Sequence, residues 1–339
     1  MDILPFFDRS QLGLKLALLS PRFDALVDAH FDGKSELTIR RWIKINKGIG
    51  PKSKLFVWID HKHVEFPLPD RPLPNKSRFI KRPRIEYIDH SVITFLHDNT
   101  HIWNRWGTSL EMLVRSKDRD GEQPIWDVLA REIWPIFAAN ICHLNISDGH
   151  HLDTLRRLIS PTMLTDLDQL VSINFDHLLL EGIAEDEPNA AFSAGQVLSE
   201  WLHTPTKNGK PKELFCAELD GRGNMAWLNT FKETFIRATD ASASYQICFD
   251  VDEQTTPIEP FELVNEWANE KLTLIQQDDT YWLLKRCPIS EEAAVQWENA
   301  ENWGHKLNDV QFDLFAGKDC IGPLSPPAAE GPSGCCAQQ

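Results

Sequence analysis

The sequence predicts an α/β fold in which a short helical N-terminal segment precedes a long series of alternating strands and helices. Three observations lead to this prediction. Apolar residues recur at helical spacing near the N-terminus, extended apolar runs begin after Asp32-Gly33, and strand-like and helix-like stretches alternate from about residue 80 onward. Such alternation along a chain is typical of α/β folds.

The N-terminal helical segment is predicted from the spacing of its apolar residues. Leu12, Leu16, Leu19, Phe23 and Leu26 are separated by 4, 3, 4 and 3 residues, which places them on one face of a helix. A shorter apolar group precedes them, formed by Ile3, Leu4, Phe6 and Phe7. Two helices this short do not bury enough surface to fold alone, so we expect support from the rest of the chain or from a partner.

The central region is predicted to repeat a strand–helix unit. After strands at 36–45 and 55–66, further strands are expected at 83–88, 109–115, 141–147, 171–175, 213–219 and 244–251, with helices at 91–102, 124–137, 152–170, 193–203 and 225–238. The starts of these six strands are 26, 32, 30, 42 and 31 residues apart. A doubly wound sheet and an αβ solenoid both contain units of about 30 residues. Because no Gly-rich phosphate loop follows a strand, the pattern favours an irregular solenoid resembling leucine-rich repeats.

The C-terminal part follows a different pattern. Short extended runs at 261–268, 271–276 and 280–286 predict a small antiparallel meander, and Ser290 is a candidate N-cap for a helix. The chain is therefore divided into a helical segment at 1–31, an αβ repeat region at 36–255, a meander and helix at 256–303, and a disordered tail at 317–339.

Composition and charge limit the classes of protein to consider. No stretch approaches the ~20 apolar residues of a membrane span, and the seven scattered cysteines favour free thiols in a reducing compartment. We expect an intracellular protein, cytoplasmic or nuclear. Residues 1–150 carry 22 Lys and Arg against 19 Asp and Glu, whereas residues 151–339 carry 13 against 31. The acidic second half argues against binding of nucleic acid.

Several short blocks give the chain a resemblance to a known family. They are Phe6-Phe7-Asp8, Leu12-Gly13-Leu14-Lys15, Leu18 to Asp28, Ile133-Trp134-Pro135, Asn140-Ile141-Cys142, Trp201-Leu202-His203-Thr204-Pro205, and Arg286-Cys287-Pro288-Ile289 with Glu291-Glu292. Together they resemble the large F-box domain proteins of plant-parasitic nematodes, over roughly residues 2 to 303. The block at 201–205 and the block at 286–289 are more specific to this family than the helical segment is.

The resemblance implies a substrate-recruiting adaptor without catalytic residues. An F-box binds a Skp-type linker protein, which binds a cullin scaffold of a ubiquitin ligase, and the remaining chain would select a target protein. The residues that the resemblance assigns to the linker are Ile3, Leu4, Phe7, Leu12, Leu16, Leu19 and Phe23. An F-box usually opens with a Leu-Pro-acidic turn, whereas this sequence begins inside the motif, so an N-terminally incomplete F-box is expected. A protein-binding or decoy module that has lost linker binding is the alternative.

Other candidate sites are weaker. His61 with His63, and His150 with His151, lack further ligands at metal-site spacing, so no metal site and no cofactor are expected. No serine-hydrolase, zinc-protease or cysteine-protease motif is present, which favours a non-enzymatic role. Cys336 stands four residues from the end of the sequence, a CaaX-like position that makes it a candidate for lipidation.

Two further groups of residues have open interpretations. The basic segment 71–84 fits a localisation signal, a patch for an acidic partner, or an ordinary surface, and a protein-facing or plain surface role is favoured. Among the twelve tryptophans, Trp126 and Trp134 share one helix face and are predicted to lie in the core, as are Trp201, Trp227 and Trp282.

Overall fold

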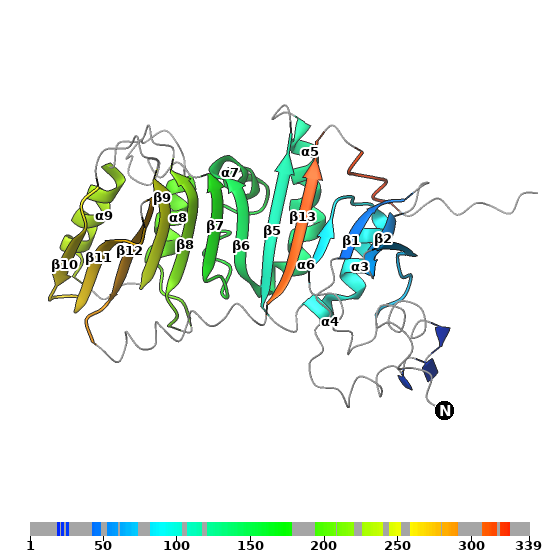
Figure 1. Cartoon of the computed structure of the whole chain (residues 1–339), viewed down its shortest axis with the longest axis horizontal. Coiled ribbons are helices and arrows are strands. Elements are labelled where there is room, and N and C mark those ends of the chain that lie inside the picture. Colours follow the sequence, from blue (N-terminus) through cyan, green and yellow to red (C-terminus); the bar gives the residue numbers. More distant parts are fainter. Residues whose placement is uncertain are drawn as a thin grey trace, which may run out of the picture.

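A computed structural model gives the fold of the chain. It describes residues 19–20, 22–23, 25–26, 43–48, 53–59, 62–73, 82–103, 107–116, 121–177, 194–207, 209–219, 226–239, 244–251, 258–278, 280–290, 307–316 and 319–325. Most of these residues belong to one large sheet and to the helices packed on it (Figure 1).

The strands of the described residues form a single 13-stranded sheet that runs along the long axis of the molecule (Figure 1). Their spatial order is β10-β11-β12-β9-β8-β7-β6-β5-β13-β4-β1-β2-β3. The bounds in chain order are β1 Ile43–Lys47, β2 Ser53–Ile59, β3 Lys62–Pro67, β4 Pro83–Ile85, β5 Thr108–Arg115, β6 Ile141–Asp148, β7 Ser172–His177, β8 Lys212–Leu219, β9 Tyr245–Val251, β10 Phe261–Asn265, β11 Glu270–Gln276, β12 Tyr281–Pro288 and β13 Asn308–Phe315.

The sheet is parallel in its centre and antiparallel at both ends. Every neighbouring pair from β9 across to β1 is parallel. The β1-β2-β3 hairpins extend one end, and the β10-β11-β12 meander joins β9 at the other. Antiparallel hairpins need only short connections, whereas parallel neighbours need crossovers, which is why helices accompany the central strands.

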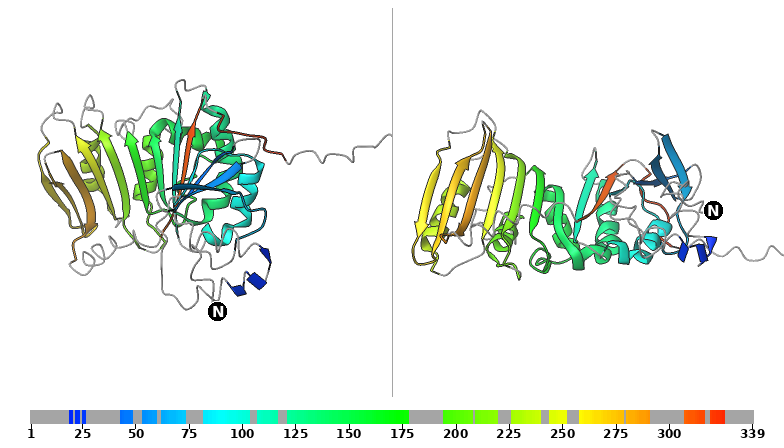
Figure 2. Two further views of the ribbon diagram at one scale, coloured as in Figure 1. Left: turned by 45° about the vertical axis from the view of Figure 1, so that its right-hand side comes forward. Right: turned by 60° about the horizontal axis from the view of Figure 1, so that its bottom comes forward.

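The helices lie on one face of the sheet (Figure 2). They are α3 His90–Asp98, α4 Thr100–Trp103, α5 Gln123–Val128, α6 Trp134–Phe137, α7 Gly149–Leu158, α8 Ala194–His203 and α9 Ala226–Arg237, with a π-helical turn at Leu129–Ile133 and a 3₁₀ turn at Ala138–Asn140. Pro135, in the first turn of α6, has no N–H to donate to the carbonyl four residues earlier, which fits the irregular turn that lies between α5 and α6. The helix predicted at 124–137 is therefore present in interrupted form.

The core lies between the helices and the sheet. Buried and partly exposed residues alternate strictly along β5, so that Leu110, Met112 and Val114 face the helices while Ser109 and Glu111 face the opposite side. The core also contains Trp126, Trp134, Trp201, Trp227 and Trp282, as predicted from the sequence, and Trp103. Large aromatic side chains supply much of the apolar area that stabilises the fold.

The predicted αβ solenoid resembling leucine-rich repeats is wrong. Although β5 to β9 are consecutive neighbours, β13 returns from the end of the chain and pairs in parallel with both β5 and β4. Antiparallel hairpins flank the parallel strands at both ends, so the architecture is one mixed sheet rather than a stack of equal units. The predicted C-terminal meander is present as β10, β11 and β12, but it is an edge of this same sheet.

Part of the segment 317–339, predicted to be a disordered tail, makes regular contacts. The backbone N–H of Ile88 donates to the carbonyl of Cys320, and that of Gly322 donates to Ile88, which forms a bridge between Ile88 and Ile321. Within the part of the chain that the structure describes, no helix is long and apolar enough to cross a membrane.

Candidate functional site

The face of the sheet opposite the helices is the most extended candidate for a binding surface. It faces the viewer in Figure 1, and no helix of the described residues lies on it. Because the strands are in register, one row of side chains crosses this face from strand to strand. The row consists of Phe56, Lys44, Arg84, Gln311, Glu111, Asn145, Asn174, Phe215, Cys248, Leu283 and Ile275. This row is polar from Lys44 to Asn174 and apolar from Phe215 to Ile275. The neighbouring row on the same face, through Thr273, Lys285, Gln246 and Glu213, is polar.

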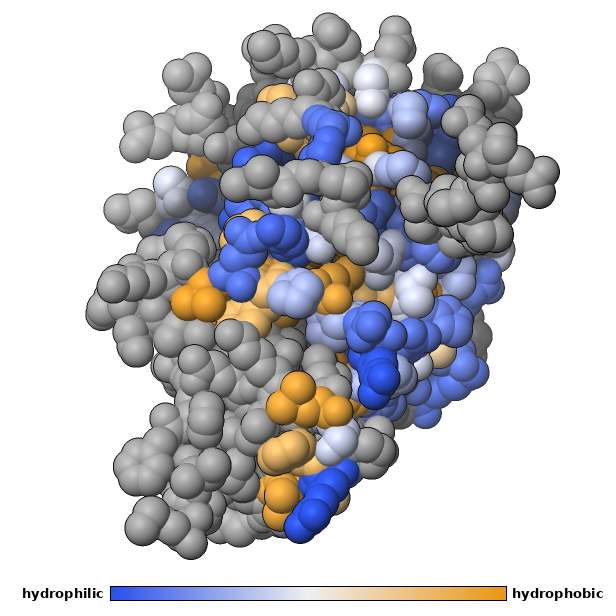
Figure 3. Space-filling view, turned by 90° about the vertical axis from the view of Figure 1, so that its right-hand side faces the viewer, coloured by the Kyte–Doolittle hydropathy of each residue, from blue (hydrophilic) through white to orange (hydrophobic). Residues whose placement is uncertain are grey.

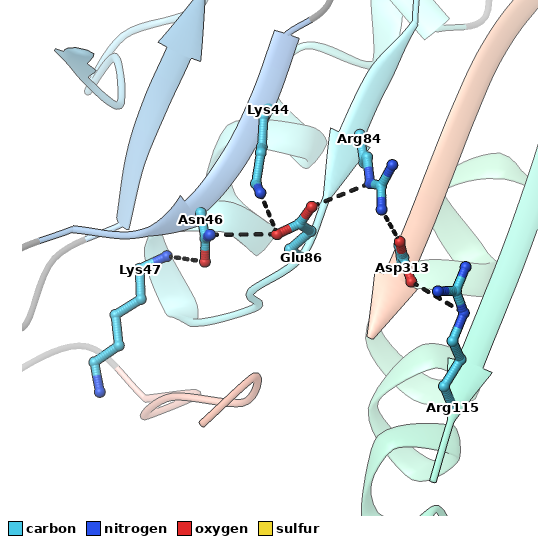
Figure 4. A network of polar contacts seen from close by, with 7 residues as sticks. All are labelled: Lys44, Asn46, Lys47, Arg84, Glu86, Arg115 and Asp313. Carbon is cyan, nitrogen blue, oxygen red and sulfur yellow. Dashed lines mark hydrogen bonds and ion pairs between the residues drawn. The ribbon is translucent and has the colours of Figure 1, made fainter. Parts of the chain in front are cut away.

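A ladder of charges occupies this face over β1, β4, β13 and β5 (Figure 4). The Lys44 ammonium lies 2.5 Å from Glu86 Oε2, and Arg84 Nε lies 3.1 Å from Glu86 Oε1. Arg84 also pairs with Asp313, whose other oxygen lies 3.7 Å from Arg115 Nε. Four of these side chains come from β1, β4, β13 and β5, and Glu86 directly follows β4, so ion pairs connect strands that are far apart in the sequence.

The central member of this ladder is Asp313. Its side chain is 8% exposed, whereas those of Arg84 and Arg115 are 35% and 57% exposed. A nearly buried carboxylate between two guanidinium groups is fixed in position, because removal of either partner would leave part of its charge uncompensated. The ladder therefore places the partly exposed guanidinium groups of Arg84 and Arg115 on either side of a fixed carboxylate.

A pocket of about 340 Å³ lies beside the ladder. It is lined by Arg82, Ser109, Glu111, Asn145, Asp309, Val310 and Gln311. Arg82 Nε donates to Asp309 Oδ2 over 2.6 Å across its rim. Guanidinium, carboxylate, amide and hydroxyl groups thus converge in one hollow, and such a set recognises polar side chains or backbone groups of a ligand.

His143 lies next to this pocket on β6, in register with Ser109. Burial lowers the pKa of its imidazole, and the nearby Asp309 carboxylate acts in the opposite direction. Loss of solvation therefore outweighs attraction to the carboxylate, which favours a neutral ring at neutral pH. No hydrogen bond joins His143 to Ser109 in the described part of the chain, so the pair lacks the contact that activates a serine nucleophile.

The sequence blocks at 201–205 and 286–289 meet on the helix-covered side of the sheet. His203, from the block at 201–205, packs edge-on against Tyr245 with ring centroids 5.5 Å apart. Arg286, from the block at 286–289, forms an ion pair with Glu270 and lies 5.3 Å from the Phe235 ring. This buried cluster faces the helices and joins α8, α9, β9, β11 and β12, so its contacts stabilise the fold and do not form an open binding surface.

The buried Lys212 contacts the backbone of the block at 201–205. Lys212 Nζ donates to the carbonyls of Trp201 and Thr204 at the C-terminal end of α8. Burial lowers the pKa of Lys212 to about 8. A cation at this end of a helix satisfies carbonyls that lack intrahelical partners and interacts favourably with the helix dipole.

The structure describes only some of the residues that the sequence assigned to sites. Leu19 and Phe23 are exposed, whereas Ile3, Leu4, Phe7, Leu12 and Leu16 lie outside the described residues, as does Cys336. His151 is buried and lies 2.9 Å from the Glu122 carboxylate. Across the described ranges, no group of three or more His, Cys, Asp or Glu side chains is arranged to hold a metal ion.

The polar row and the pocket were not predicted from the sequence. Ser109, Glu111, Asn145, Asp309 and Gln311 alternate with buried apolar residues, and this alternation was the available signal. Comparison with known proteins gives no further guide. No family model, no curated protein and no solved structure matches the chain.

Proposed function

We propose that the chain is a non-enzymatic adaptor that holds a target protein on the uncovered face of its sheet and binds a Skp-type linker through its N-terminal segment. The observation that carries the proposal is the uncovered face itself. A face without a helical layer presents a broad, rigid set of side chains, and the pocket at Arg82 and Asp309 offers a point for polar recognition.

The N-terminal segment supports the linker half of the proposal. Leu19, Phe23 and Leu26 are 66%, 39% and 46% exposed. Apolar surface, coloured orange, is visible in Figure 3 at the lower end of the molecule, where the described residues of the N-terminal segment, dark blue, lie in Figure 1. Neighbouring apolar side chains left in contact with water are typical of a surface that a partner covers. The F-box resemblance supports a Skp-type linker as that partner, which would attach the chain to a cullin scaffold of a ubiquitin ligase.

Binding of the linker is tested with purified proteins. Isothermal titration of the full chain with a Skp-type linker should detect a complex, and the double variant Leu19→Asp, Phe23→Asp should weaken it at least tenfold. Ile236→Asp is the matched control, because Ile236 is an apolar helix residue of similar exposure, 62%, on α9 far along the chain. This control should bind the linker like the wild type.

The result separates the adaptor from its alternative. If the wild-type chain does not bind the linker, the ligase-adaptor proposal fails, and a protein-binding or decoy module remains as the function. If both the Leu19, Phe23 variant and the Ile236 control bind as the wild type does, the N-terminal segment is not the linker site.

A further inference from the structure

The most exposed aromatic side chain of the described residues is Trp267, in the turn between β10 and β11. It is 90% exposed, whereas the other large apolar side chains of these two strands are less exposed. A tryptophan that remains in water gains no stabilisation from burial of its large apolar surface. Tryptophan is also enriched among the residues that contribute most of the binding energy at protein interfaces.

The turn that carries Trp267 is braced by a buried asparagine. Asn265 Nδ2 donates to the carbonyls of Phe235 and Ala238, both over 2.8 Å, at the end of α9. Its Oδ1 accepts from the backbone N–H groups of Trp267 and Ala268 at 3.0 and 3.1 Å. One side chain thus uses both its donors and its acceptor to fix the turn to the helix.

The far side of the same turn is fixed to β12. The backbone N–H of Ile289 donates to the carbonyl of Asn269 over 3.1 Å. Asn269 has φ of 53°, a left-handed conformation that asparagine adopts more readily than most residues. Since the turn is held at both sides, little backbone entropy is lost when a ligand contacts Trp267.

The strand that leads to Trp267 has a free edge. β10 pairs with β11 on one side, and it has no second neighbour among the described strands (Figure 1). An edge strand presents unpaired backbone N–H and carbonyl groups to which another extended segment can pair. Val264, on the uncovered face of β10, is 56% exposed.

The segment that contains β10 and its turn carries exposed carboxylates, and the cations beside it are Lys232, whose Nζ lies 4.0 Å from the centre of the Phe261 ring, and Lys271, opposite Val264 on β11. Glu259, Glu262 and Glu266 are exposed, and none has an ion-pair partner among the described residues. In the sequence, the interval between Arg237 and Lys271 contains eight Asp and Glu and neither Lys nor Arg. Carboxylates beside an exposed indole ring form a combination that binds cations, through ion pairs and through the face of the ring.

We infer that the β10 edge and Trp267 together bind an extended, Lys- or Arg-rich segment of a protein partner. The segment adds to β10 as a further strand, one of its cationic side chains lies over the Trp267 ring, and others pair with Glu262 and Glu266. This inference does not depend on linker binding, because it concerns the opposite end of the sheet from the N-terminal segment.

The test uses the full chain and fluorescently labelled eight-residue peptides. One peptide alternates Lys with Thr or Val, and the other carries Glu in place of Lys. Anisotropy should detect binding of the Lys peptide only, with affinity that falls as salt rises. Trp267→Ala should weaken binding about tenfold. Glu262→Gln with Glu266→Gln should also weaken it and reduce its salt dependence, whereas the control Leu324→Ala, at an exposed apolar residue outside the meander, should not change it.

Hydrogen exchange tests the mode of binding. Bound Lys peptide should slow amide exchange in β10, Phe261–Asn265, more than in the interior strand β6, whose amides are already paired. The inference is overturned if the Glu peptide binds equally well, if Trp267→Ala binds like the wild type, or if β10 gains no protection. Concentration-dependent dimerisation that Trp267→Ala abolishes would also overturn it, since the partner would then be a second copy of the chain.

Discussion

Arg286 and Glu270 form an ion pair whose side chains are 1% and 2% exposed. Both Nε and Nη2 of Arg286 donate to Glu270 Oε2, over 2.9 and 2.7 Å. Arg286 lies on β12 and Glu270 on the neighbouring strand β11. Both side chains are on the helix-covered face of the sheet. A buried charge is tolerable only while its partner is present, so this pair connects the sequence block at 286–289 to the stability of the meander.

Removal of one partner should therefore destabilise the protein. Glu270→Gln leaves the Arg286 guanidinium buried without a carboxylate, and we expect a loss of about 3–5 kcal/mol of unfolding free energy. Urea denaturation followed by circular dichroism measures it. Glu233→Gln, which removes an exposed pair with Arg237, should change stability by less than about 0.5 kcal/mol. Equal stability of Glu270→Gln and the wild type would contradict the structural role of the pair.

The N-terminus of α3 depends on Asp89. Its Oδ1 accepts from the Val92 N–H at 3.0 Å, and its Oδ2 accepts from the Ser53 hydroxyl at 2.6 Å, so one carboxylate caps the helix and fixes it to β2. Asp89→Ala should lower the unfolding free energy by about 1–2 kcal/mol. The same substitution at exposed Asp98, near the C-terminal end of α3, should cause no loss, because a carboxylate there opposes the helix dipole. Similar losses in both variants would argue against the cap.

The stability of the protein should depend on pH through His203. Burial lowers the pKa of its imidazole below the ordinary 6.5, and Arg286 and Lys212 act in the same direction, against the hydrogen bond to the Ser199 carbonyl. At pH values between the folded-state pKa and the unfolded-state pKa of about 6.5, the unfolded chain binds more protons than the folded protein. The contribution of His203 to stability is therefore fully present above about pH 6.5 and is lost as the pH falls toward the folded-state pKa.

The contribution of His203 is isolated by a variant. His203→Gln keeps a side chain of similar polarity without the titration, so its unfolding free energy should fall less between pH 7 and pH 5 than that of the wild type, at about 25 °C. Denaturation midpoints at several pH values measure this difference. Parallel pH profiles for the two proteins would show that His203 does not titrate differently in the folded state.

The buried thiols should be unreactive while the protein is folded. Burial raises the pKa values of Cys216, Cys287 and Cys320, so little thiolate forms at neutral pH. In a Cys335→Ser, Cys336→Ser variant, a thiol reagent should modify Cys216, Cys287 and Cys320 only after denaturant is added. The change in absorbance at pH 8 follows the reaction. Rapid modification of the three thiols without denaturant would contradict their burial.

Local pattern was a good guide to individual elements of this chain and a poor guide to their arrangement. The strands predicted at 109–115 and 141–147 correspond to β5 and β6, because alternation of apolar residues is a local signal. The strand β13 was missed, although Val310, Phe312 and Leu314 alternate with polar residues. Its pairing with β5 joins residues about two hundred positions apart, and no local pattern specifies which strand a segment joins.

Local sequence patterns were also insufficient to predict the candidate binding surface. A single alternating strand indicates that one of its faces is polar, but only the register across β4, β13, β5 and β6 brings Arg82, Ser109, Asn145 and Asp309 to one pocket. Trp267 was not distinguished from the core tryptophans, because its exposure results from the turn that Asn265 braces. The linker contacts of the N-terminal segment remain predictions from the resemblance.

The position of β13 also has a consequence for synthesis of the protein. Strands β1 to β4 emerge from the ribosome early, and β5 to β12 follow, yet the two groups are joined through a strand that begins at residue 308. Until that strand arrives, the facing edges of β4 and β5 lack a partner, and unpaired edges invite association with other chains. Nascent chains stalled before residue 308 should therefore require chaperones more than completed chains do.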